Sequence, residues 1–197
     1  MLSAPTLREA VGPVSLAGEQ VLPVLPALQG LLPGGVLRRG STVAVVGSTS
    51  LALALAAAAS ESGSWCAAVG LPSLGLMAVA ELGVALERLA LVREPGESWP
   101  SVVAALLDAL DVVVVRPPGP VRGSHVRRLA ARARERGAVL VPMGSWEGAD
   151  VCLRVTRSEW HGLGAGHGYL RSRRSEVTAR GRGAAARPRQ AGVWLPR

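Results

Sequence analysis

The chain contains one segment whose residue types match part of a phosphate-binding loop. Residues 42–46 are apolar after Thr42, Gly47 follows them, and residues 51–59 are rich in alanine and leucine. Between a strand and a helix, such a loop needs glycines that wrap backbone amides around the anion, a lysine for the outer phosphates, and a serine or threonine for the metal ion. The residues at the position of the loop are Gly47, Ser48, Thr49 and Ser50.

The lysine that phosphate binding requires is missing from this segment. The chain has 22 lysine and arginine residues together, and all of them are arginine. Counted from Gly47, Ala52 stands at the second glycine position and Leu53 stands at the lysine position. We therefore expect no nucleotide cofactor at this loop, and we interpret the chain as a non-catalytic relative of an ATPase.

Other residues that could bind a metal ion are scattered along the chain. His125, His161 and His167 have no cysteine or carboxylate beside them at ligand spacing. Cys66 and Cys152 each lack a second cysteine nearby, which argues against a zinc site or a disulfide framework and is typical of a reducing compartment. We expect no metal ion and a cytoplasmic location.

The net charge of +8 is unevenly distributed. Residues 1–115 contain five arginines and nine acidic residues, whereas residues 116–197 contain seventeen arginines and five acidic residues. A basic segment predicts an anionic partner, either nucleic acid or an acidic protein surface. Tryptophan is enriched at binding hot spots. The candidate contact residues are Arg127, Arg128, Trp146, Trp160, Arg171, Arg173, Arg174, Arg180, Arg182, Arg187 and Arg189.

Each of these contact residues also has a structural interpretation. Arg127 and Arg128 can equally form the solvated face of a helix, because apolar residues recur on its other face. Trp146 and Trp160 can equally cover the end of a sheet as part of the core. The sequence alone leaves both alternatives open.

The pattern of apolar runs predicts the fold class α/β. From residue 42 onward, strand-length apolar runs alternate with helical patterns, and strands that are apolar on both faces are typical of a parallel sheet covered by helices. The expected strands are residues 42–46, 66–69, 89–92, 111–115 and 138–141. The expected helices are residues 51–60, 74–82, 101–110 and 125–136, the last with Ser124 as N-cap and Gly137 as its C-terminal stop.

After residue 150 the pattern changes. Alternating apolar and polar residues predict short antiparallel strands at 151–156, 169–173, 176–179 and 192–195, joined by glycine-rich turns such as residues 162–168. Residues 180–189 are rich in glycine, alanine and arginine, which predicts a flexible basic loop. Charged residues interrupt the most apolar stretches, so no segment is expected to span a membrane.

Three segments, in this order, resemble the core of RecA recombinases. They are Leu31-Leu-Pro-Gly-Gly-Val-Leu-Arg-Arg-Gly-Ser-Thr-Val-Ala-Val-Val-Gly47, the run from Trp65 through Leu82-Gly83-Val84 to Leu89-Ala-Leu-Val92, and Asp111-Val-Val-Val-Val-Arg116. The resemblance covers roughly residues 20–160. Within the RecA-like superfamily the chain is most similar to the degenerate branch of ImuA and SulA-related proteins, in particular to actinobacterial-type ImuA.

This resemblance implies a RecA-like core with a mostly parallel central sheet flanked by helices, ending in short antiparallel strands. It divides the chain into three parts. Residues 1–40 would be an N-terminal helix and entry segment, with the helix near residues 5–10. Residues 41–160 would be the degenerate RecA-like core, and residues 161–197 the basic C-terminal strands and loop.

The departures from the RecA pattern concern the parts that perform phosphoryl transfer. Where RecA proteins place the glutamate that activates water, this chain has Gly70-Leu71-Pro72. Where the aspartate that organises the metal ion would follow Val115, it has Arg116. With the altered phosphate loop, the cradle, the base and the metal support are all changed. We therefore expect no catalytic residues and no enzymatic activity.

The resemblance also implies a function and partners. The expectation is a non-catalytic adaptor in DNA-damage-induced translesion synthesis, which binds an ImuB-type inactive Y-family polymerase and an error-prone DnaE-type polymerase. Its basic C-terminal region would bind the partner or contact the DNA near it, and the cytoplasmic protein would join the nucleoid when the damage response is induced. One alternative is a SulA-like inhibitor of cell division, which shares the fold. A second alternative is an enzyme with residual nucleotide binding.

Overall fold

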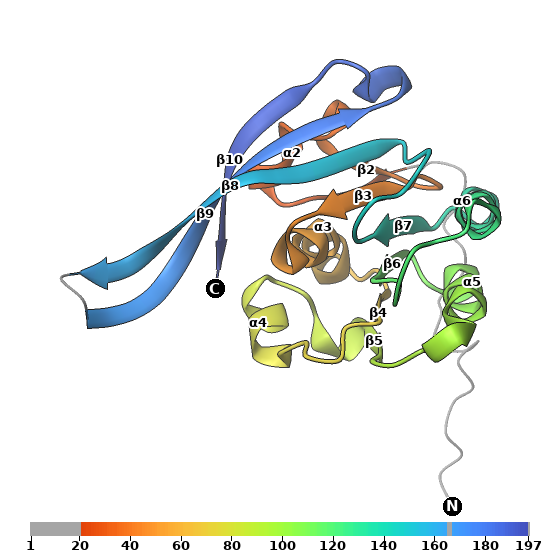
Figure 1. Ribbon diagram of the computed structural model, residues 1–197, viewed down its shortest axis with the longest axis horizontal. Coiled ribbons are helices and arrows are strands. Elements are labelled where there is room, and N and C mark those ends of the chain that lie inside the picture. Colours follow the sequence, from red (N-terminus) through yellow and green to blue (C-terminus); the bar gives the residue numbers. More distant parts are fainter. Residues whose placement is uncertain (1–20, 165–166, 197) are drawn as a thin grey trace, which may run out of the picture.

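The protein folds around a sheet with helices on both of its faces. This computed structural model describes residues 21–164 and 167–196, and it describes the side chains of residues 21–162 and 172–195. The helix expected near residues 5–10 lies outside the described residues. The α/β fold class expected from the sequence is confirmed (Figure 1).

Five parallel strands form the centre of the sheet. Four of them pair in the order β5-β4-β6-β7, and bridges from Thr42 to Leu140 and from Val45 to Met143 join β7 to β3. Their side chains are almost entirely apolar, as expected for strands that are covered on both faces. All five were predicted with ends correct to one residue: β3 (Val43–Val46), β4 (Cys66–Val69), β5 (Leu89–Val92), β6 (Val112–Val115) and β7 (Val139–Pro142).

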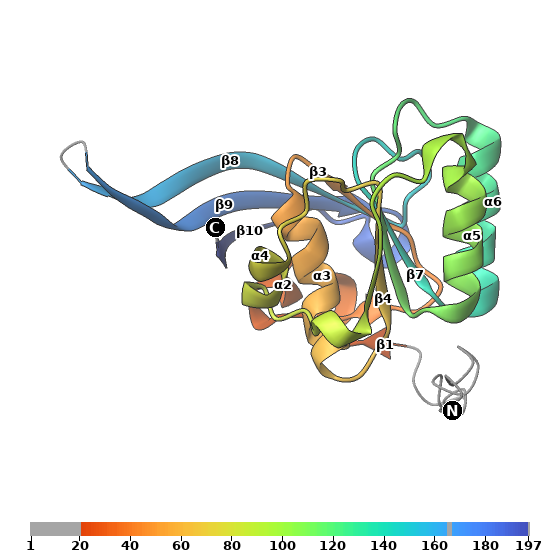
Figure 2. The ribbon, with the colours of Figure 1, turned by 90° about the horizontal axis from the view of Figure 1, so that it is seen from below.

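Helices cover the two faces of this sheet separately. Figure 2 shows α5 (Trp99–Ala109) and α6 (Gly123–Arg136) on one face, and α3 (Thr49–Glu61) and α4 (Leu76–Glu81) on the other. Alternate residues of each strand therefore join two apolar clusters, one under each helix layer. All four helices occur where the sequence predicts them. No described helix is both long and apolar enough to cross a membrane.

The ends of α6 test the predicted capping residues. Gly137 adopts a left-handed conformation with φ of 67° and ends the helix, as predicted. The prediction for Ser124 is wrong. Arg122 is the extended residue before the helix, and its carbonyl accepts the first helical hydrogen bonds, from the amides of His125 and Val126. Ser124 therefore lies inside the first turn.

The entry segment, residues 21–38, packs on the same side of the sheet as α3. It consists of β1 (Val21–Leu22), α2 (Pro26–Gln29), a 3-10 turn (Pro33–Gly35) and β2 (Leu37–Arg38), which pairs with β1 antiparallel. Further 3-10 turns lie at Leu86–Arg88 and Gly96–Ser98. Leu28, Leu31 and Leu37 are buried against the same apolar cluster as α3.

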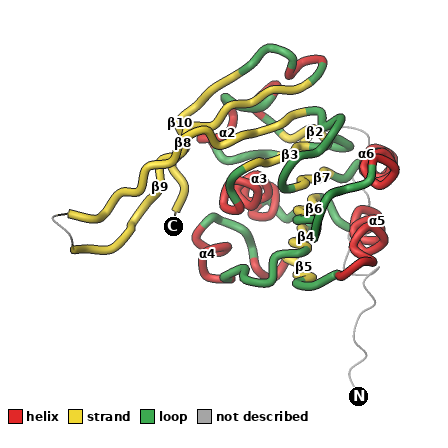
Figure 3. Tube along the Cα trace, viewed as in Figure 1, coloured by secondary structure: helices red, strands yellow, loops and turns green. Residues whose placement is uncertain are grey.

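Three long strands extend the sheet beyond β3. The strand β8 (Val151–Gly164) pairs with β3 in parallel and with β9 (His167–Gly181) in antiparallel fashion, and β9 pairs with β10 (Arg189–Pro196). The antiparallel direction was predicted, but the expected short strands are wrong. Register shifts after Val155 and after His161 let β8 and β9 stay paired through the glycine-rich stretch expected to be a turn. They leave the body as a two-stranded arm (Figures 1 and 3).

The loop expected at residues 180–189 is also ordered differently. Residues 180 and 181 end β9, a 3-10 turn follows at Gly183–Ala185, and Arg189 begins β10. The amide of Arg182 donates to the carbonyl of Asp150 at 3.0 Å, and Ala185 is buried. The expected boundary between residues 160 and 161 falls inside β8.

Both cysteines are free, and they differ in burial. Burial, reinforced by the carboxylate of Asp111, raises the pKa of the Cys66 thiol to about 12. Asp111 in turn accepts hydrogen bonds from the guanidinium of Arg39 and from the amide of Trp65, at 2.8 Å and 2.9 Å. Asp111 therefore fixes the start of β6 to two neighbouring segments.

Candidate functional site

The phosphate-loop position is a short turn between β3 and α3. Only Gly47 and Ser48 separate the two elements, and Gly47 has a φ of 92°. Ser48 is the N-cap of α3, and its Oγ accepts a hydrogen bond from the amide of Leu51 at 3.1 Å. Thr49 and Ser50 lie in the first helical turn, and Leu53, at the lysine position, is buried inside α3.

Arg116 reaches this turn from the end of β6. One of its terminal nitrogens donates to Oγ1 of Thr49 at 2.6 Å. The two residues border a cavity of about 270 Å³ at the carboxyl ends of β3, β6 and β7, where open α/β sheets commonly bind ligands. Its lining contains no carboxylate, although Mg²⁺ prefers carboxylate and other oxygen ligands.

The backbone of Arg116 also fixes the residue type at position 70. Gly70 follows β4 with a φ of 74°, and a Cβ atom there would lie 2.2 Å from the carbonyl oxygen of Arg116. Real Cβ atoms do not approach an oxygen so closely. This backbone therefore accommodates glycine at the position where RecA proteins place a glutamate.

A second arginine approaches the turn from the distant β9. One terminal nitrogen of Arg173 donates to Oγ of Ser48 at 2.5 Å, and its guanidinium lies 5.3 Å from the ring centroid of Trp160. Burial lowers the pKa of this guanidinium. Its Nε is buried without a hydrogen-bond partner among the described residues. Two cations thus meet at the N-terminal end of α3, where the helix dipole is positive.

The long strands carry a second group of polar and aromatic residues. In register, Trp160, Arg173 and Leu195 form one row across β8, β9 and β10, and the next row is formed by Glu159, Arg174 and Trp194. Successive residues of a strand point to opposite faces. The first row therefore lies on the face of the sheet packed against α3, and the second row lies on the other face.

This other face is not covered by a helix in the described part of the chain (Figure 2). The apolar cluster under α5 and α6 contains no residue of β9 or β10. Trp194 is 54% exposed there, and the ring of His161 lies 4.9 Å from it, centroid to centroid. We call this surface the open sheet face and define it by five residues, namely Arg154, Arg157, Arg174, Arg180 and Trp194.

The structure separates the remaining predicted contact residues. Arg127 and Arg128 are exposed on α6, away from the arm. The side chain of Arg171 lies outside the described part of the structure. Arg182 donates to the carbonyl of Gly148 and pairs with Asp150, and Arg189 donates to the carbonyl of Ala184, so both make local contacts. The remaining one, Arg187, is exposed.

Of the two predicted tryptophans, one belongs to the core. Trp146 is only 7% exposed and packs in the cluster under α5 and α6, which favours the core alternative for this residue. Trp160 is 48% exposed, because β8 extends beyond the end of α3. The sequence reasoning missed Trp194, whose only signal was its residue type, and the contact between Arg173 and Ser48, which no sequence pattern marks.

Comparison with known proteins agrees with this architecture. The model of one protein family, described as the MT3502 N-terminal domain, matches residues 30–148, more than half of the chain. The chain belongs to this family. The match covers β3, α3 and the strands up to β7, so it contains the phosphate-loop position but not the arm.

A relative and a solved structure resemble longer parts of the chain. The uncharacterized protein Rv3395c of Mycobacterium tuberculosis is 37% identical over 127 residues, which are 62% of each chain, so the match spans about three fifths of this curated relative. The crystal structure of the RadB recombinase matches with a TM-score of 0.55 and 16% identity, covering 86% of this chain and 91% of that chain. The likeness to RadB shows that the fold is RecA-like.

Proposed function

We propose that the chain is a non-catalytic, ImuA-type adaptor of a DNA-damage-induced translesion synthesis complex. The observation that carries this proposal is the arrangement at the phosphate-loop position. Arg116 and Arg173 donate to the hydroxyls of Thr49 and Ser48, and a buried leucine stands where the lysine is expected. Phosphoryl transfer needs a phosphate cradle, a metal ion and an oriented nucleophile. The missing lysine and a cavity lining without carboxylates support the proposal that this chain does not perform it.

The proposed partners are an ImuB-type inactive Y-family polymerase and an error-prone DnaE-type polymerase. The long strands β8 and β10 support a role in binding them, because Trp160 on β8 and Trp194 on β10 are both about half exposed in a chain with only five tryptophans. Exposed tryptophans bury a large area at protein interfaces and dominate their binding energy. Arginine beside them adds directional hydrogen bonds and cation–π contacts.

Contact with DNA is the second part of the proposal. The open sheet face presents four arginines together with Trp194, without a covering helix, and one of the four, Arg157, is paired with Glu159. Arginines on an open surface bind the phosphate backbone, and such binding weakens steeply as salt is added. Trp194 and His161 form one tilted aromatic pair, which is too small to serve as a platform for several bases.

The test is binding of the full-length chain to the ImuB-type homologue of its own organism. We expect the double variant Trp160→Ala/Trp194→Ala to raise the dissociation constant at least about tenfold. Truncation of a hot-spot tryptophan reduces the binding free energy by ~2 kcal/mol or more. Met77→Ala is the matched control, because Met77 is 75% exposed on α4, outside the arm. Circular dichroism of each variant checks that the fold is retained.

Two results would contradict the proposal. One is a full-length chain that binds neither polymerase homologue. The other is a double variant that binds both homologues as tightly as the unchanged chain, which would show that these two tryptophans are not part of the interface. Filamentous growth of cells that overproduce the chain, without any polymerase binding, would favour the SulA-like alternative.

A further inference from the structure

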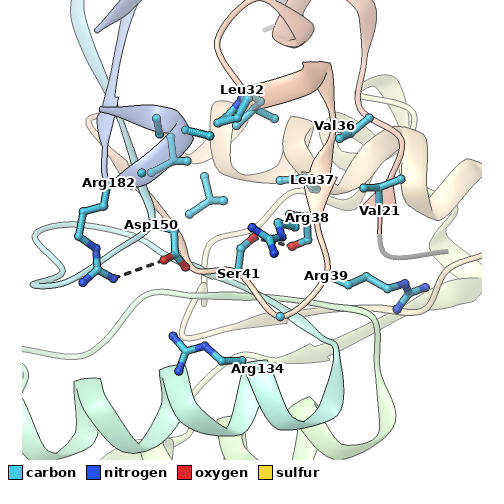
Figure 4. A pocket seen from close by; sticks show the side chains of 17 residues that line it. Val21, Leu32, Val36, Leu37, Arg38, Arg39, Ser41, Arg134, Asp150 and Arg182 are labelled. Atoms are coloured by element: carbon cyan, nitrogen blue, oxygen red, sulfur yellow. Dashed lines mark hydrogen bonds and ion pairs between the residues drawn. The ribbon is translucent and has the colours of Figure 1, made fainter. Parts of the chain in front are cut away.

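A second, larger cavity lies at the opposite edge of the sheet from the phosphate-loop position. Its volume is about 720 Å³, within the range of ligand-binding pockets. Val43 and Val151, the first residues of the parallel strands β3 and β8, line it, so it lies at their amino ends. The entry segment, the last turn of α6 and the 3-10 turn after β9 complete its walls (Figure 4).

The floor of this cavity is apolar and held in place by the core. Leu32, Leu37 and Ala185 line it and are at most 3% exposed. The wall toward α6 is tightly packed, because a Cβ atom on Gly40 would lie 3.2 Å from the Cα of Arg134. The cavity is therefore formed before any ligand binds.

The charged residues around the floor are unequally paired. Asp150, the acidic residue of the lining, is already satisfied: one of its oxygens accepts from the amide of Thr42 at 2.9 Å, and the other lies 3.3 Å from Arg182. Arg39 is paired with Asp111. The side chains of Arg38 and Arg134 make no hydrogen bond or ion pair with any residue that the structure describes.

We propose that this cavity binds an acidic peptide segment of a partner protein, with an apolar side chain on the floor and carboxylates on both sides of it. Two arginines with an apolar floor between them complement a peptide that has an apolar side chain between two carboxylates. Arg38 and Arg134 come from different elements, β2 and α6, and border the floor from different directions (Figure 4). A peptide with two separated carboxylates engages both arginines, whereas a small amphipathic acid has only one carboxylate to offer.

The test uses a defined probe and the full-length chain labelled with ¹⁵N. The probe is the peptide Asp-Asp-Leu-Leu-Asp-Asp, acetylated and amidated at its ends, and the measurement is the change in amide chemical shifts at low salt. We expect the shifts to concentrate at Gly40, Ser41 and Ala185, which line the cavity. A second peptide with serine in place of leucine reports binding by charge alone, and hexanoate reports binding of a small carboxylate.

Variants locate the interaction. We expect Arg38→Gln/Arg134→Gln to weaken peptide binding at least about fivefold, a change of ~1 kcal/mol. Arg127→Gln/Arg128→Gln removes the same charge from exposed residues outside the cavity and should leave binding unchanged. Ala184→Trp, at an exposed position of the lining, should block the cavity without disturbing the core.

Several outcomes would overturn the inference. They are the absence of binding at millimolar peptide, equal binding of the serine peptide, tighter binding of hexanoate, shifts confined to the open sheet face, and equal loss of binding in both double arginine variants. None of these measurements contains a polymerase, so failure here is distinguishable from failure of the adaptor proposal.

Discussion

At the scale of single residues, the hydroxyl groups at the phosphate-loop position already take part in hydrogen bonds within the protein. Ser48 caps α3 and accepts from Arg173, and Thr49 accepts from Arg116. Gly70 is needed because the carbonyl of Arg116 lies against it. Gly70 and Arg116, two of the residues that depart from the RecA pattern, therefore have a structural role in this fold.

Restoring the lysine tests whether this position can regain phosphate binding. We expect Leu53→Lys to lower the free energy of unfolding by about 3 kcal/mol or more, because an ammonium group without a partner would be buried inside α3. The urea midpoint measures this loss. Leu53→Met is the control, since a volume-conserving change costs less than about 1.5 kcal/mol. A lysine variant as stable as the unchanged chain, and further stabilised by ATP, would contradict the interpretation.

The sequence predicted some of these residues and missed others for a physical reason. The positions of Arg116 and Leu53 could be predicted, because Arg116 directly follows β6 and Leu53 lies within α3. Both elements have a clear local pattern of apolar residues. Arg173 could not be linked to Ser48, because 125 residues separate them and the register of β9 brings them together. The role of Trp146 stayed open in the sequence, because a loop tryptophan and a core tryptophan have the same sequence pattern.

At the scale of elements, α5 and α6 are joined by an ion-pair cluster beside their apolar contact. Asp108 on α5 lies 2.5 Å from Arg132 and 3.2 Å from Arg136, both on α6. The hydrogen bond from Arg132, with the charge of both arginines, lowers the pKa of this carboxyl. Arg132 and Arg136 are partly exposed to solvent and at the same time connect the two helices.

The lowered pKa gives a signed prediction for stability against pH. Asp108→Asn should lower the free energy of unfolding by up to ~1 kcal/mol at pH 7, the usual value for a partly exposed pair. The carboxylate stabilises the folded chain above its ordinary pKa of about 3.9, and this contribution is lost as the pH falls through the lowered folded-state value. The difference between the two chains should therefore disappear in acid.

Thermal unfolding of the unchanged chain and of Asp108→Asn, from pH 7 into acid and at low and high salt, measures this difference in stability. Salt should reduce the difference at pH 7, because the pair is partly exposed. Glu81→Gln is the control, since Glu81 is exposed on α4 and has no ion pair within the described residues. A stability difference that grows in acid would contradict the assignment.

Element boundaries show how far local patterns extend. Gly137 could be predicted as the end of α6, because glycine adopts the left-handed conformation without strain. The length of β8 and β9 could not, because two register shifts keep the strands paired where the sequence contains turn residues. Such pairing depends on contacts between strands rather than on local propensity.

At the scale of the whole molecule, the fold follows from local sequence patterns, whereas the candidate binding surfaces depend on contacts between segments. The order of strands and helices predicted the RecA-like sheet, since buried parallel strands are the clearest pattern in the sequence. The arginine-bordered cavity combines segments far apart in the chain, and the open sheet face and the arm depend on the register in which β8, β9 and β10 pair. The molecule thus presents an aromatic and basic surface at one end and a separate cavity at the amino ends of β3 and β8.

The absence of nucleotide binding is the claim on which the adaptor proposal rests. Isothermal titration of the full-length chain with ATP and Mg²⁺ tests it most directly. We predict no saturable heat of binding up to about 1 mM nucleotide. At this concentration a dissociation constant of about 1 mM or lower, a binding free energy of about −4 kcal/mol or better, would be detected. A dissociation constant in the micromolar range, lost in an Arg116→Ala variant that still folds, would contradict the account.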